Sequence, residues 1–277
     1  MTENVQLRER VPLWLCFILI FLISWPGAIP MILASYGKTL SAPVKLLQIL
    51  MLFGPAIAVC LASWINSGWI GVKQLLRGLV IWRVSIGWYF LALLVPLLIY
   101  AASLLFSNMS GQTNTRLPAP DKWAPTFFMT LGVYLLLNTE EIAWRGYVLP
   151  RLQKHFGVFI AALVIGLIWT VFHLPLFWMK GGHPAGYPFW LFTVMVFCIT
   201  FLFSAAYNGT SGSVLIVHLL HQGLNAAVEA IPVYPKAVHS ILPMCLASAA
   251  FLLIALFLLL KVKKEGRVLD PPLKVQY

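Results

Sequence analysis

Residues 241–260 read ILPMCLASAAFLLIALFLLL, an uncharged apolar run that is followed by Lys261, Lys263 and Lys264. A helix needs about 20 mainly apolar residues to cross the hydrocarbon core of a bilayer, which is about 30 Å thick. Lysines directly after such a run are typical of the point where a helix leaves the hydrocarbon. This segment therefore predicts a transmembrane helix.

Similar apolar runs recur through the rest of the chain. The protein is 61% hydrophobic and only 10% charged, whereas soluble domains carry about 25% charged residues. This composition excludes a soluble nucleotide-binding domain and a disordered chain. It predicts an all-α fold, a polytopic bundle of about eight transmembrane helices that forms a single integral-membrane domain over 1–277. The predicted spans are 11–35, 46–66, 86–107, 124–149, 157–177, 189–207, 213–230 and 241–260.

The first run begins after Arg8 and Arg10, as the apolar region of a signal peptide would. Its apolar character continues toward Ala34 without a clear cleavage site of small residues. We therefore expect this segment to be retained as a membrane span.

The distribution of basic residues predicts the orientation. With the N-terminus in the cytosol, thirteen of the 19 Lys and Arg residues fall on the cytosolic side and six on the other. We therefore expect both termini inside, an interfacial amphipathic helix over 68–84 and a basic cytosolic tail over 261–277. The net charge of +11 favours contact with anionic lipid headgroups, and no basic stripe suggests nucleic-acid binding.

Three of the eight acidic residues, Glu140, Glu141 and Glu229, fall in or beside predicted spans. A charged side chain at the bilayer centre costs about 2.5 to 3.5 kcal/mol or more, so such residues indicate a function by default. On a helix, Glu141 and Arg145 lie about 40° apart as an i, i+4 pair, whereas Glu140 points about 140° away from Arg145. Glu140 is therefore a carboxylate without an ionic partner, as a general base would be. A purely structural ion-pair cluster at the membrane edge is the alternative.

Histidines complete this polar group. His173 lies within the apolar run 157–177. If runs four and five form an antiparallel hairpin that turns near 154–157, Glu140 and His173 lie level with each other. The seventh run carries His218, His221, Asn225 and Glu229 within about 80° on one helix face, which predicts a polar or catalytic cavity.

Three motifs resemble those of the CPBP family, which includes type II CAAX prenyl endopeptidases, bacteriocin-processing proteins and lysostaphin-resistance-like proteins. Its E-E-x-x-x-R motif is matched by Glu140, Glu141 and Arg145. Its F-x-x-x-H motif is matched at His173 with Trp169 in the place of phenylalanine, and its H-x-x-x-N motif by His221 and Asn225. The motif-bearing core is 124–230.

The resemblance implies an intramembrane endopeptidase. By the count of basic residues its site opens toward the cytosol, and the protein lies in the plasma membrane if the host is prokaryotic. The resemblance also implies that Glu140 and His173 activate a water, that Glu141 and Arg145 fix the helix, and that His221 and Asn225 stabilise the oxyanion. A zinc ion held by His173 and His221 is the alternative, since the spacing does not choose between the two versions. The implied partner is a membrane-associated protein or a lipidated peptide, with or without a prenyl group.

Two other classes of protein remain open. A transporter or channel also uses intramembrane Glu, Arg and His residues as a proton or ion pathway. Against it stand the absence of an internal repeat in the sequence and the gathering of the polar residues in one cluster. A non-catalytic immunity or scaffold protein of the same fold is the second alternative.

Overall fold

The computed structural model describes residues 10–181 and 188–266, which form helices and turns but no β-strand. The predicted all-α fold is confirmed. Arg8 and most of the predicted basic tail lie outside the described residues, and the first part of that tail continues the last helix to Lys264. In chain order the described helices are α1 Leu13–Ser24, η1 Trp25–Gly27, α2 Ala28–Ser35, α3 Ala42–Leu46, α4 Ile49–Leu76, η2 Arg77–Val80, α5 Ile86–Leu93, α6 Val95–Met109, α7 Pro120–Leu137, α8 Glu140–Ala143, η3 Trp144–Val148, α9 Leu149–Phe172, η4 Leu174–Trp178, α10 Phe189–Gly209, α11 Val214–Ala230, α12 Pro235–Val238 and α13 Leu242–Lys264.

Six stretches in the described part of the chain are long and apolar enough to cross a membrane, or seven if α5 and α6, which meet at 42°, form one bent span. They are Leu13–Ser35, Ile49–Val80, Glu140–Trp178, Phe189–Gly209, Val214–Val238 and Leu242–Lys264. The sequence predicted about eight.

One span of the difference is the predicted 86–107, which counts only if the bent pair α5 and α6 is one span, and the other arises at the predicted span 124–149. Its helix stops at Leu137 because Asn138 adopts an extended backbone conformation, and a new helix starts at Glu140. The first part, α7, begins with Pro120 and Asp121 and is too polar there to count as a span. The second part continues into the predicted span 157–177, with a break at Gly157, whose φ is +73°. The boundary between the fourth and fifth predicted spans was expected near 150, and in the structure it lies at Asn138.

Helix α4 is also divided. Ser67 and Gly68 leave the helical conformation, and Gly68 has a φ of +57°. The helical segment after this break exposes Trp69 and Lys73 but buries Leu75. The helical part of the segment expected over 68–84 ends at Val80, and its amphipathic character and its place at the membrane interface stay predictions.

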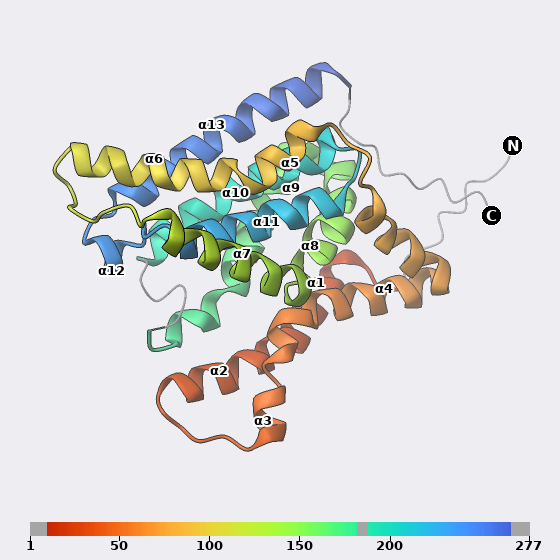
Figure 1. Ribbon diagram of the computed structural model, residues 1–277. Coiled ribbons are helices and arrows are strands. Elements are labelled where there is room, and N and C mark those ends of the chain that lie inside the picture. The colour runs from red at the N-terminus through yellow and green to blue at the C-terminus, as the bar shows by residue number, and fades with distance from the viewer. Residues whose placement is uncertain (1–9, 182–187, 267–277) are drawn as a thin grey trace, which may run out of the picture.

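Helix α11 lies in the middle of the larger group of helices and is enclosed by α5, α6, α7, α8 and α10 (Figure 1). Helices α1 to α4 form the other end of the molecule, where α2 and α3 extend away from the bundle (Figure 1). Small residues allow helices to approach closely when no hydrophobic effect drives them together in lipid. Gly223 of α11 is such a residue, since a Cβ there would collide with the carbonyl oxygen of Ala92 on α5.

We expect Gly223→Ala to destabilise the protein because the colliding atom belongs to the backbone of α5 and cannot rotate away. Overpacking of this kind costs about 1 to 3 kcal/mol. Thermal unfolding in detergent would show the loss as a lower midpoint. Gly132→Ala on α7 is the matched control, since a Cβ there would meet no atom within 4 Å. Equal midpoints for both variants would contradict the close contact between α11 and α5.

Candidate active site

The site begins where α8 starts, between α4 and α11 (Figure 1). The Asn138 side chain acts on Glu140 twice. Its Oδ1 accepts the backbone N–H of Glu140 at 3.1 Å, and its Nδ2 donates to Glu140 Oε1 at 3.1 Å. Asn138 therefore both satisfies a free N–H at the helix start and fixes the carboxylate.

Two indole groups hold the other carboxylate oxygen. Trp169 Nε1 donates to Glu140 Oε2 at 2.6 Å, and Trp144 Nε1 donates to the same oxygen at 3.3 Å. Glu140 is only 7% exposed. A buried carboxylate loses its hydration, and three N–H donors replace part of it.

Glu141 faces a different set of partners. Arg145 Nη1 donates to both Glu141 oxygens, at 2.9 and 3.0 Å, as the i, i+4 spacing predicted. His221 Nδ1 lies 2.9 Å from Glu141 Oε1, although 80 residues separate the two in sequence. Glu141 and Arg145 are fully buried. This buried triad therefore ties α8 to α11.

The Arg145 guanidinium is further enclosed by two aromatic rings. Its Cζ lies 4.8 Å from the ring centre of Trp169 and 4.8 Å from that of Phe203. Cation–π contacts of this kind gain strength when water is excluded. Arg145 falls in η3, a π-helical turn, and such turns occur often at functional sites.

The hydrogen bonds assign the proton positions on both imidazoles. His173 Nδ1 lies 2.9 Å from the backbone oxygen of Trp169, which can only accept. His221 Nδ1 faces the Glu141 carboxylate, which also accepts when ionised. Each ring therefore carries a proton on Nδ1, and each Nε2 remains for another partner. This assignment follows from the acceptor that each Nδ1 faces.

Glu140 and the two imidazoles belong to one cluster. Trp169 links them, because its indole contacts Glu140, its carbonyl holds His173, and its ring centre lies 5.3 Å from that of His221. Glu140 also interacts electrostatically with both imidazoles. His173 is partly exposed, whereas His221 is buried. His173 therefore lies on the accessible edge of the cluster.

The remaining polar residues of α11 diverge from this centre. Asn225 is partly exposed and donates to Gln222 Oε1 at 3.1 Å. His218 Nε2 lies 3.1 Å from the backbone oxygen of Leu135 on α7, and Glu229 is exposed. The structure thus gathers Glu140, Glu141, Arg145, His173 and His221, with Asn225 one helical turn beyond His221.

The geometry also bears on the zinc alternative. In the described ranges 10–181 and 188–266, no group of three His, Cys, Asp or Glu side chains is arranged to hold a metal ion. Glu140 Oε2 accepts two indole N–H groups, and Glu141 is engaged by Arg145 and His221. His173 and His221 therefore lack the third ligand that a catalytic zinc site takes from the protein, and we derive no step through a metal.

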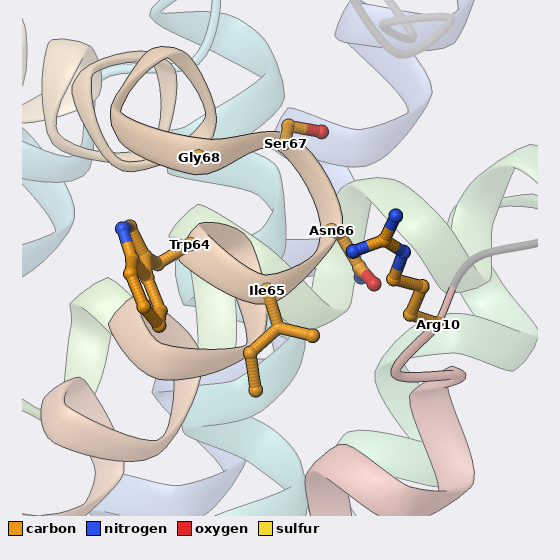
Figure 2. A pocket seen from close by; sticks show the side chains of 6 residues that line it. All are labelled: Arg10, Trp64, Ile65, Asn66, Ser67 and Gly68. Atoms are coloured by element: carbon orange, nitrogen blue, oxygen red, sulfur yellow. The ribbon is translucent and has the colours of Figure 1, made fainter.

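A separate cavity of about 570 Å³ lies at the break in α4 (Figure 2). Figure 2 shows the Arg10 guanidinium beside Asn66, with Trp64 on the far side of the helix turn. The cavity is lined by Arg10, Trp64, Ile65, Asn66, Ser67 and Gly68. None of the candidate catalytic residues lines it.

Three residues that donate hydrogen bonds to Glu140 were not predicted from the sequence. Trp144 stands at i+4 from Glu140, so the spacing alone signals a contact on one helix face. Trp169 was considered only as an aromatic replacement for phenylalanine in a motif. Its indole N–H makes the shortest of the hydrogen bonds to the Glu140 carboxylate. Asn138 gave a weaker signal, as a polar residue just before two glutamates.

Comparisons with known proteins match the segment of the chain that contains these residues. The family model for type II CAAX prenyl endopeptidases of the Rce1-like kind matches residues 121–227, which include all six candidate catalytic residues. CAAX prenyl protease 2 of Methanococcus maripaludis is 29% identical over 93 residues, which is 33% of this chain and 34% of that protein. The chain thus matches about a third of the length of this curated relative.

Proposed function

Because residues 121–227 match the Rce1-like family model and carry the motifs of the CPBP family, we propose that the chain is a CAAX-type endopeptidase of the membrane. The observation that carries this proposal is the convergence of Glu140, His173 and His221 on one mainly buried cluster. A carboxylate beside two imidazoles is what general acid–base hydrolysis requires. The substrate is a membrane-associated protein or peptide, and a prenylated one is the first to test.

Glu140 is the proposed base. A water between Glu140 Oε1 and His173 Nε2 attacks the carbonyl carbon of the scissile amide, and its proton passes to Glu140. The same proton then goes to the departing amine as the C–N bond breaks. Enzymes gain about 10²- to 10⁴-fold from such positioned proton transfer.

His221 is the proposed oxyanion donor. Its Nδ1 is committed to Glu141, so only Nε2 can face the oxyanion. It donates there when the ring carries a proton on both nitrogens. Asn225 adds a second donor through the N–H that Gln222 does not take. Arg145 balances the charge of Glu141, so that the carboxylate is not left unpaired beside the reaction.

The transporter alternative is less favoured by this arrangement. A proton or ion pathway needs polar groups spaced along the membrane normal. Here Glu141, Arg145 and His221 are hydrogen-bonded to one another, and Glu141 and Arg145 are fully buried.

We expect the purified protein in liposomes to hydrolyse a fluorogenic peptide that ends in a farnesylated CAAX sequence. Mass spectrometry of the products would locate the cleaved bond. The same peptide without the farnesyl group is the control, and its slower cleavage would assign the lipid a role in binding. Exhaustive chelation should leave the rate unchanged, since no metal takes part in the proposed steps. A rate lost on chelation and restored by zinc would instead support the zinc alternative, and no cleavage of either peptide would contradict the proposal.

A further inference from the structure

Trp169 makes the shortest bond to the proposed base. We propose that Trp169 is a positioning residue, whose indole N–H fixes the Glu140 carboxylate so that Oε1, and not Oε2, takes the proton from the attacking water. This inference rests on the proposed function, because it concerns the same carboxylate.

The bonds to Glu140 are divided unequally between its two oxygens. An ionised carboxylate has about four acceptor sites, two on each oxygen. Oε2 accepts both Trp169 and Trp144, whereas Oε1 accepts only Asn138. Oε1 is therefore the oxygen with a free acceptor site for a water.

The Trp169 ring is held in place on several sides. Arg145 lies over its face at 4.8 Å, His221 meets its edge at 5.3 Å and 84°, and Phe203 lies 5.9 Å away. The side chain is only 2% exposed. A ring packed in this way cannot swing, so its N–H holds a fixed direction. That rigidity suits a group that must orient a catalytic side chain.

The N–H is a specific property of this chain. Trp169 stands where the motif that the sequence resembles has phenylalanine, and a phenylalanine ring provides no N–H donor. A hydrogen bond from a neutral donor to a charged acceptor is stronger than one between neutral groups. Trp169 thus adds a constraint on Glu140 that the motif itself does not supply.

The test is Trp169→Phe, measured with the fluorogenic farnesylated CAAX peptide in liposomes. We expect kcat to fall roughly 10- to 100-fold, as the loss of a hydrogen bond to a charged group implies. KM should stay unchanged, because the bond acts on the base and not on bound substrate. Trp190→Phe is the matched control, since Trp190 lies on α10 with 55% of its side chain exposed. Its kcat and KM should equal those of the wild type.

A second variant separates the N–H from the packing of the ring. Benzothienylalanine at position 169 keeps the bicyclic shape but replaces the N–H by sulfur. We expect the same loss of kcat with a wild-type unfolding midpoint. Full activity of this variant would overturn the inference, even if Trp169→Phe failed to fold.

The two proposals fail in different ways. If Glu140→Gln stays active, or the wild type does not cleave the peptide, the proposed function itself is wrong. If Glu140→Gln is inactive while both changes at position 169 keep full kcat, only the role of Trp169 is wrong.

Discussion

Glu140→Gln is expected to lower kcat by about 10²- to 10⁴-fold, the contribution of a positioned general base. The change removes the charge that accepts the water proton but keeps the shape of the side chain. The amide oxygen of glutamine can still accept an indole N–H, so the fold should survive. Hydrolysis of the farnesylated CAAX peptide by purified protein in liposomes measures the effect.

Glu265→Gln is the matched control for this variant. It makes the same chemical change at an exposed position after α13, far along the chain from the site. Its rate should equal that of the wild type. A Glu140→Gln protein that keeps more than about a tenth of the wild-type kcat would contradict the assignment of Glu140 as the base.

Arg145→Met is expected to cause the largest loss of stability. Arg145 and Glu141 form a fully buried pair, and the substitution would leave the Glu141 carboxylate buried with only His221 as a partner. Breaking a buried pair by removing one partner costs about 3 to 5 kcal/mol. Thermal or denaturant unfolding in detergent should show a clearly lower midpoint.

The double variant Glu141→Leu with Arg145→Met provides the control. It removes both charges at once, so we expect a higher unfolding midpoint than for Arg145→Met alone. Activity should not return, because His221 loses the carboxylate that orients it. A double variant less stable than Arg145→Met would show that the cost came from lost packing against Trp169 and Phe203 instead of from an unpaired charge.

Much of this fold can be predicted from the sequence because each membrane span is determined by a short, contiguous stretch of apolar residues. Twenty apolar residues in a row, as at 241–260, need no distant partner to predict a helix. The pairing of Glu141 with Arg145 is equally local, since residues four apart meet on one helix face. The helix after 241 and the pair of Glu141 with Arg145 are both confirmed.

The span predicted over 124–149 is wrong because one residue interrupts an apolar run. Asn138 ends α7 by adopting an extended conformation and bonding to Glu140, a single event within a hydrophobic stretch. Hydropathy averages over such an event, so it predicted one span over 124–149. The true break moves Glu140 from the middle of a helix to its first turn.

The bonds that shape the candidate site are mostly long-range. His221 meets Glu141 across 80 residues, and Trp169 meets Glu140 across 29. Motif spacing predicts that such residues lie in neighbouring helices, but the choice of oxygen or ring nitrogen depends on side-chain rotation in the packed protein. Only the structure shows that His221 Nδ1 bonds to Glu141 and that Glu140 Oε2 accepts from two indoles.

The central claim is that Glu140 supports peptide-bond hydrolysis at the membrane. The most direct measurement is membrane proteomics with mapping of peptide termini, in cells that carry either the wild-type chain or Glu140→Gln at equal abundance. We predict a short set of new termini, in membrane-associated proteins, that appears only with the wild type. Identical termini in both cells, with the variant folded, would contradict the claim and favour a transporter or scaffold of the same fold.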